Sequence, residues 1–285
     1  TLCPGKYSFL LESVEGGERW SRYSFMGMEP MFVFQSKGND IIVRFGDRTE
    51  EHRVEDPLRF LASRLSEFQP FGVKGLPRFY GGAVGYLGYE TVCFFEPVPD
   101  SLPDRTEVPD TWFMVPRLVL IFDNLKQTIQ VVFNLYISPE SDVIALYDEA
   151  ADRIQEVVQR IRKRVLPSAR PGTGVPPQAI RSNMSRTTFE SMVQKAKEYI
   201  RQGEIIQVVL SQGFEANTRA DPFDVYRILR RVNPSPYLFY LQFDDVALLG
   251  SSPEVMVRLE EGRITLRPIA GTRPRGENEE EDQAL

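Results

Sequence analysis

Residues 167–185 interrupt the chain and so limit the folds open to it. This stretch holds four prolines and two glycines among small and polar residues. Such a composition sustains neither a helix nor a strand, and we interpret it as a linker. With 285 residues, 42% of them hydrophobic, the chain is long enough for one large domain or two of ordinary size. The linker favours a division into two parts.

The part before the linker is rich in strand signals. Short apolar runs alternate with Gly and Asn turns over residues 7–45, which is typical of an antiparallel meander. Asp56-Pro57 predicts a helix start, because Asp accepts bonds as an N-cap and Pro suits the first turn. This helix should end before Pro70. Beyond it we expect strands at 117–122 and 128–133, then an amphipathic helix at about 140–165.

A glycine-rich run at residues 79–90 admits two interpretations. Its glycines can cradle a phosphate group, or they can let a strand pack closely on a neighbour. A phosphate loop needs a helix N-terminus directly after the glycines, and no amphipathic pattern follows here. We therefore expect a closely packed strand.

The part after the linker mixes helical and strand patterns. Thr187-Thr188-Phe189-Glu190 resembles a capping box and predicts a helix that ends at Gly203. Residues 205–212 alternate with a period of two, which predicts a strand. Asp221-Pro222 predicts a second helix, and three short strands follow it. The whole order predicts an α+β fold in which antiparallel β-sheets pack as a sandwich with flanking helices.

Charge and composition exclude several classes of partner. A net charge of −6 and a pI near 5.2 argue against nucleic acid and anionic membrane surfaces as partners. No apolar run approaches the roughly 18–20 residues of a membrane span, and no secretory signal pattern opens the sequence. Cys3 and Cys93 are too few for a disulfide framework. We expect a cytoplasmic protein with reduced thiols.

The single histidine, His52, lies in a charged segment, where we expect a solvated side chain rather than a catalytic one. The loop at residues 267–276 is a better candidate site, with three arginines, two prolines and two glycines after a short strand pattern. Gly271 and Thr272 offer short hydrogen-bond donors that suit a small anion. The same residue types also form ordinary solvated turns.

Six motifs in order along the chain resemble the chorismate-utilising enzymes, and among them component I of anthranilate synthase. They are Leu10-Leu11-Glu12-Ser13, Arg22-Tyr23-Ser24-Phe25, residues 203–211, Asn233-Pro234-Ser235-Pro236-Tyr237, Gly250-Ser251-Ser252-Pro253-Glu254 and the loop 267–276. The resemblance covers essentially the whole chain. It implies a tryptophan-binding region at 1–166, the linker at 167–185, and the first part of a chorismate-binding catalytic domain at 186–285.

The resemblance also implies a reaction. Such a lyase adds ammonia to chorismate, eliminates pyruvate and leaves anthranilate for tryptophan biosynthesis. It uses Mg²⁺ on a substrate carboxylate, and a glutamine amidotransferase subunit, component II, supplies the ammonia within an expected heterotetramer. Gly271 and Thr272 match the chorismate contact of the family.

The family continues past Leu285 with the glutamates that bind Mg²⁺ and with a catalytic histidine. We therefore expect the chain to be an N-terminal fragment without metal ligands of its own. The acidic run Glu277–Asp282 is expected to be the solvated start of a helix.

Two related enzymes are the nearest alternatives. Aminodeoxychorismate synthase component I often has a nucleophilic lysine where this chain has Ala270. Isochorismate and salicylate synthases have a water-activating lysine at the position of Gln207. A neutral Gln207 suits orientation of ammonia, although a strand glutamine that bonds the backbone is an equally open interpretation.

A third alternative is an amino-acid-binding fragment without catalysis. In the family, the first and fourth motifs bind tryptophan as a feedback inhibitor. The resemblance implies that Glu12 and Ser13 meet the polar edges of tryptophan and that Arg22 holds its carboxylate. Its indole ring would be enclosed by Pro236, Tyr237 and Leu238.

Overall fold

The computed structural model describes residues 5–14, 22–99, 103–104, 106–163, 179–268, 274 and 276–284. It divides the chain into two compact units. The first, which we call the sheet unit, joins Thr1–Val165 with Pro222–Pro253, and the second joins Leu166–Asp221 with Glu254–Leu285. The units interleave along the sequence, so they do not coincide with the regions 1–166 and 186–285. Within the described ranges, no helix has the length and apolar character needed to cross a membrane.

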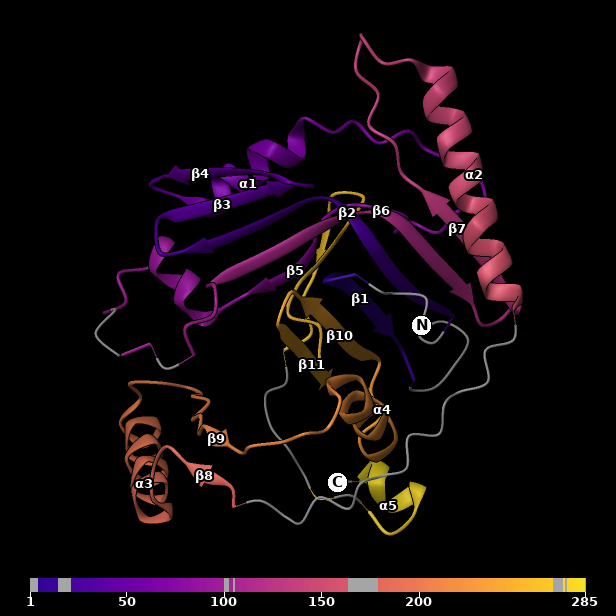
Figure 1. The fold of residues 1–285 in the computed structure, drawn as a ribbon. Helices are drawn as coiled ribbons and strands as arrows, with labels where there is room; N and C mark the ends of the chain where they lie inside the picture. The colour runs from indigo at the N-terminus through magenta and orange to yellow at the C-terminus, as the bar shows by residue number, and fades with distance from the viewer. Residues whose placement is uncertain are drawn as a thin grey trace. The chain divides into compact units, whose positions relative to one another are not determined.

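One antiparallel sheet of nine strands forms the sheet unit (Figure 1). Its strands are β1 (Tyr7–Glu12), β2 (Tyr23–Lys37), β3 (Asp40–Phe45), β4 (Arg48–Arg53), β5 (Val84–Leu87), β6 (Thr111–Asp123), β7 (Thr128–Phe133), β10 (Tyr237–Phe243) and β11 (Val246–Ser252). They run in the order β11-β10-β1-β2-β3-β4, and β6 pairs with β2, β5 and β7. The meander expected over residues 7–45, the strands expected at 117–122 and 128–133, and the α+β class are therefore confirmed.

Two halves of this sheet share the long strands β2 and β6. β1 pairs with residues 25–28 of β2, whereas β3 pairs with its residues 33–37. Between them, the register of β2 against β6 shifts at a bulge between Pro30 and Phe32, and such bulges bend a strand. The halves pack face to face, with Trp112 of one stacked on Phe243 of the other at 5.1 Å between ring centroids. The expected sandwich is thus made by one folded sheet.

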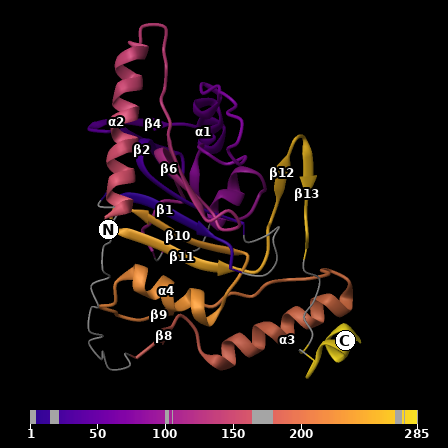
Figure 2. The same cartoon turned by 90° about the vertical axis from the view of Figure 1, so that its right-hand side faces the viewer.

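Four helical segments belong to the sheet unit: α1 (Pro57–Ser66), the 3₁₀ helix η1 (Tyr89–Phe94), α2 (Val143–Arg162) and α4 (Pro222–Val232). The α1 start is confirmed, because Asp56 Oδ1 accepts from the backbone N–H groups of Leu58 at 3.0 Å and Arg59 at 2.9 Å. The buried side chain of Val157 packs α2 onto its half of the sheet. In Figure 2, α4 lies along β10 and β11.

Within the glycine-rich run, Val84–Leu87 forms β5, as the packing interpretation predicts, and the 3₁₀ helix that begins at Tyr89 was not predicted. A Cβ atom on Gly85 would lie 1.9 Å from the carbonyl oxygen of Trp112 and 2.7 Å from Cα of Phe113. Only glycine lets β5 approach β6 so closely.

The described part of the second unit contains α3 (Arg186–Gln202), α5 (Glu279–Ala284) and two short two-stranded antiparallel sheets. One sheet pairs β8 (Arg181–Ser182) with β9 (Phe214–Glu215), and the other pairs β12 (Arg258–Glu260) with β13 (Arg263–Thr265). Gly203 ends α3 with a φ of 78°, as expected. The expected capping box is wrong: Ser185 caps the helix, and Glu190 pairs with Arg186 at 2.7 Å. Helix α5 confirms the helical interpretation of the acidic run.

The strand expected at 205–212 is not formed. A strand needs a partner backbone, and within the described ranges no strand pairs with this segment. Its apolar side chains stay outside a core, with Ile206 97% and Val209 84% exposed. The alternation of side chains is typical of a strand, but a strand also needs a second strand to pair with, and alternation does not provide one. Residues 167–178, which are most of the linker proposed at 167–185, lie outside the described residues.

Candidate functional site

Strands β1 and β10 end together and join two segments that are far apart in the sequence. Glu12 is the cross-strand partner of Leu238, and the backbone N–H of Val14 donates to the carbonyl of Ser235 at 3.1 Å. The expected neighbourhood of the first and fourth motifs is therefore confirmed. We call this place the β1–β10 end.

Alternation along the strands sends neighbouring side chains to opposite faces of the sheet. Glu12 and Leu238 share the face covered by α4, because Tyr226 of α4 bonds the Glu12 carboxylate. Leu11 and Phe239 point the other way, into the core between the two sheet halves. By the same alternation, Ser13 and Tyr237 belong to that inner face.

The Glu12 carboxylate is held by two side chains of α4. Its Oε2 atom accepts from the Tyr226 hydroxyl at 2.7 Å and from Arg230 Nε at 3.2 Å. Tyr226 is only 1% exposed, and burial, followed by the bond to Glu12, raises the pKa of its hydroxyl. The sequence predicted the helix that begins at Asp221-Pro222, but it did not reveal this role of Tyr226. The signal is a tyrosine among apolar positions with an arginine four residues later.

Ser13 has the opposite environment. Its Oγ atom is buried, and no residue that the structure describes forms a hydrogen bond with it. Burying a hydroxyl without a partner costs about 1–3 kcal/mol, so such a group calls for an explanation. A polar ligand that bonds Ser13 would remove this cost.

The turn beside Ser13 is braced by short polar contacts. Ser235 is 4% exposed; its hydroxyl donates to the Ser252 carbonyl and accepts from the Tyr237 N–H at 3.0 Å. Ser251 Oγ donates to the Asn233 carbonyl at 2.6 Å. The turn is therefore a fixed wall beside Pro236 and Tyr237, whereas Leu238 is 1% exposed beneath α4. This placement does not support direct contact of Leu238 or the Glu12 side chain with a ligand on the inner face.

Arg22 forms an ion pair with Asp123. Its Nη2 atom lies 3.0 Å from Asp123 Oδ2, and its Nε donates to both Asp123 oxygens at 3.3 Å. The bond to Arg22 lowers the pKa of Asp123. The guanidinium also lies over the Tyr23 ring, 4.8 Å from its centroid. A ligand carboxylate at Arg22 would have to share this group with Asp123.

The expected chorismate and catalytic residues belong to the second unit. Gln207 is exposed in a segment without regular structure, so the strand setting expected for it is absent. Gly271 and Thr272 lie outside the described residues.

Among the residues whose positions are described, no three His, Cys, Asp or Glu side chains gather as metal ligands would. Polar groups around α5 bond its own backbone instead: Asp282 Oδ1 accepts from the Gly276 N–H at 2.9 Å, and Glu281 Oε2 from the Glu277 N–H at 2.8 Å. These residues do not fit an Mg²⁺ site.

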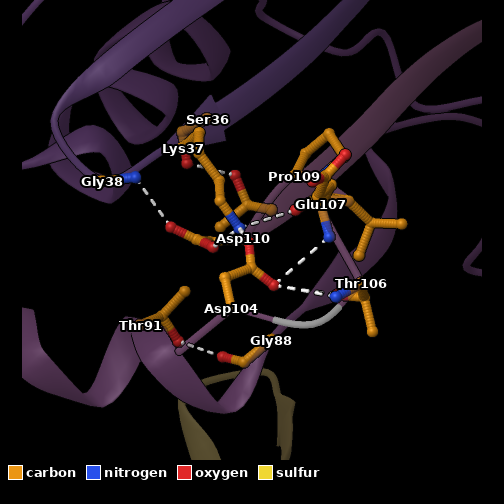
Figure 3. A network of polar contacts seen from close by, with 12 residues as sticks. Ser36, Lys37, Gly38, Gly88, Thr91, Asp104, Thr106, Glu107, Pro109 and Asp110 are labelled. Carbon is orange, nitrogen blue, oxygen red and sulfur yellow. Dashed lines mark hydrogen bonds and ion pairs between the residues drawn. The ribbon is translucent and has the colours of Figure 1, made fainter. Parts of the chain in front are cut away.

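A third polar cluster fastens the loop before β6 (Figure 3). Lys37 Nζ lies 2.5 Å from Asp104 and 3.0 Å from Asp110, and it donates to the Val108 carbonyl at 2.9 Å. Burial opposes charge on Lys37, but its bonds to Asp104 and Asp110 outweigh this and raise its pKa. The bond to Lys37 lowers the pKa of Asp104. The partners in all these bonds are groups of the protein, so we assign the cluster a structural role. We call it the clip around Lys37.

Comparisons with known proteins give the chain its relatives. The family model described as chorismate binding enzyme matches residues 7–285. Anthranilate synthase component 1 of Aquifex aeolicus is 41% identical over 99% of this chain and 57% of that protein. A probable anthranilate synthase component 1 of Schizosaccharomyces pombe is 36% identical over 98% of this chain and 54% of its own length.

The crystal structure of anthranilate synthase component I from Streptococcus pneumoniae is similar, with a TM-score of 0.71 and 28% identity. The match covers 90% of this chain and 55% of that one. The chain thus spans little more than half the length of these relatives. With a family match over nearly its whole length, the chain belongs to the chorismate binding enzymes.

Proposed function

We propose that this chain is part of an anthranilate synthase component I. The observation that carries the proposal is its likeness, over nearly all its length, to two relatives that bear that name. The enzyme adds ammonia to the ring of chorismate with loss of the ring hydroxyl, then releases pyruvate to leave anthranilate. Gly271 and Thr272 donate hydrogen bonds to the chorismate dianion, and Gln207 orients ammonia.

Residue chemistry favours this reaction over those of related enzymes. Ala270 offers no amine to attack the ring, as the lysine of many aminodeoxychorismate synthases does. Gln207 is neutral and cannot activate water as a base. Mg²⁺ supplies charge for a substrate carboxylate in this class of enzyme, but the described carboxylates form no site for it and we assign it no step.

The ammonia comes, in this proposal, from a glutamine amidotransferase subunit in a cytoplasmic heterotetramer. A glutaminase needs a cysteine activated by a histidine. Cys93 lies on the 3₁₀ helix, and His52 lies on β4 within 3.4 Å of Glu50. Among the described residues, neither takes part in such a pair.

Product analysis of the complete gene product tests the reaction. With chorismate, Mg²⁺ and ammonium, we expect anthranilate and pyruvate in equal amounts, identified by chromatography and mass. Dominant formation of 4-amino-4-deoxychorismate or isochorismate would contradict the assignment.

The same protein binds tryptophan at the β1–β10 end as a feedback inhibitor. The buried hydroxyl of Ser13, which has no hydrogen-bond partner among the described residues, supports this site, because an amino acid brings both donors and acceptors to it. Tyr237 and Pro236 flank the indole ring, and Arg22 attracts the ligand carboxylate while bonded to Asp123. Glu12 contributes indirectly, since its clamp by Tyr226 and Arg230 fixes the strand end that carries Ser13. Amino-acid binding by the chain itself is therefore our second candidate function.

A further inference from the structure

A hollow of about 1000 Å³ opens on the sheet unit where β2 bends. We call it the bend hollow, and its walls come from β2, the β3–β4 turn, the end of α1, the β6–β7 pair and α2. It shares no lining residue with the β1–β10 end. The lining residues are Glu29, Pro30, Met31, Phe32, Phe45, Gly46, Glu67, Phe68, Arg117, Phe133, Tyr136, Glu149, Asp152, Arg153 and Glu156.

Aromatic rings form the base and one wall of the bend hollow. The Phe32 ring lies 5.5 Å from that of Phe45 and 5.9 Å from that of Phe68, and Tyr136 meets Phe68 edge-on at 5.4 Å. Phe32 is 3% exposed, whereas Tyr136 is 55% exposed at the rim. Aromatic faces carry a negative potential that attracts cations, especially where water is partly excluded.

The charged lining is predominantly acidic. Five carboxylates and two guanidinium groups face the bend hollow, which leaves three formal negative charges in excess. This potential disfavours an anion and favours a positively charged ligand.

This excess already includes the two arginines, and each of them pairs with carboxylates of the lining. Glu67 also has a partner, because Arg64 lies 3.5 Å from it. Arg153 pairs with Glu29 and with Glu156, and the bond to Glu29 is the main cause that raises the Arg153 pKa. Arg117 lies 3.7 Å from Glu149. Among the described residues, none forms an ion pair with Asp152. Asp152 is therefore a carboxylate that a ligand cation can meet.

The backbone at this place is also unusual. Glu29 has a φ of 55°, which is the left-handed region, and it lies directly before the bulge at Pro30 and Phe32. Non-glycine residues in this region are strained by about 1–3 kcal/mol, and such strain often accompanies functional sites. The bulge aims Glu29 toward Arg153 and so shapes the wall of the hollow.

We propose that the bend hollow binds a small organic cation with a flat apolar body, of the arylalkylamine class. The aromatic base receives the ring, and the ammonium group meets Asp152 at the rim. A bare divalent ion is a poor alternative, because the described carboxylates do not converge as metal ligands. The site is independent of chorismate and tryptophan.

Calorimetric titration of the full chain with 2-phenylethylammonium tests the proposal, with 2-phenylethanol and 3-phenylpropionate as neutral and anionic probes of similar shape. We expect saturable binding of the amine, at least fivefold tighter than that of the alcohol, and none of the carboxylate. Asp152→Asn should weaken amine binding at least threefold and leave alcohol binding unchanged. Tyr136→Ala should weaken both.

Glu51→Gln is the matched control, since it removes an exposed carboxylate of β4 that does not line the hollow. It should leave amine binding unchanged. Absence of saturable amine binding, equal affinity for all three probes, or an unchanged affinity in Asp152→Asn would each overturn the proposal.

Discussion

Two adjacent residues, Glu12 and Ser13, show how strand alternation assigns different tasks to neighbours. The Glu12 carboxylate is held by α4, while the Ser13 hydroxyl is buried on the inner side without a described partner. Sequence motifs identified both positions as important. They did not reveal which face α4 covers, because that depends on how β1 pairs with β10 and how α4 packs on them.

The Tyr226→Phe substitution tests the clamp on Glu12. It removes the 2.7 Å hydrogen bond and leaves the largely buried carboxylate with Arg230. A hydrogen bond to a charged group contributes about 1.5–3 kcal/mol, so we expect urea unfolding to show a loss of about 1–2 kcal/mol. Tyr80→Phe, which removes a bond to the Phe71 carbonyl at the surface, should change stability by less than about 0.5 kcal/mol. Equal effects of both changes would contradict the clamp.

At the scale of elements, local sequence signals predicted most helices and strands of the sheet unit. They failed where a strand forms only if a second strand pairs with it. Asp56 and Gly203 marked their helix ends because caps and left-handed turns depend on few residues. The strand at 205–212 failed because its pattern needs a neighbouring strand. The capping box failed because the helix begins two residues earlier, where Ser185 Oγ accepts from the Thr188 N–H.

Gly85→Ala tests the close approach of β5 to β6. The added methyl group meets backbone atoms of Trp112 and Phe113, which cannot rotate away as a side chain can. Overpacking typically costs about 1–3 kcal/mol, and we expect the upper end of this range in thermal or urea unfolding. Gly72→Ala is the control, because no atom lies within 4 Å of its added Cβ. A stability loss no larger than that of the control would show that β5 can shift.

The clip around Lys37 makes the loop before β6 sensitive to pH. Because the pKa of Asp104 is lowered in the folded state, its contribution is present above the unfolded pKa and is lost as pH falls through the folded value. Hydrogen exchange should show constant protection of the Thr106 and Glu107 amides, which donate to Asp104 Oδ1, from pH 7 to about 4, and lower protection below that.

Lys37→Met should lower this protection near neutral pH and make it depend less on pH, because Asp104 then titrates nearer its ordinary pKa and its folded and open states differ less in proton binding. Arg59→Met removes an exposed cation outside the cluster and should leave the profile unchanged. A profile that is the same in wild type and Lys37→Met would show that Lys37 does not hold the loop.

At the scale of the whole molecule, the order of elements along the chain does not reveal which of them pack into the same unit. Strands β10 and β11 and helix α4 follow the linker, yet they complete the sheet unit beside β1. Composition and periodicity predicted the α+β class but not this interleaving, since register between distant strands is not encoded locally. The family resemblance brought the first and fourth motifs together, whereas Tyr226, Arg230 and the bend hollow emerged only from the fold.

Titration of tryptophan into the full chain, followed by calorimetry, tests the proposed β1–β10 site most directly. We expect saturable binding to the wild type, because the ligand gives the buried Ser13 hydroxyl a partner. Ser13→Phe fills the inner face and should weaken binding more than tenfold, with folding verified by circular dichroism. Ser63→Phe, an exposed change on α1, should bind as the wild type does. No binding to the wild type, or equal affinity in Ser13→Phe, would contradict the account.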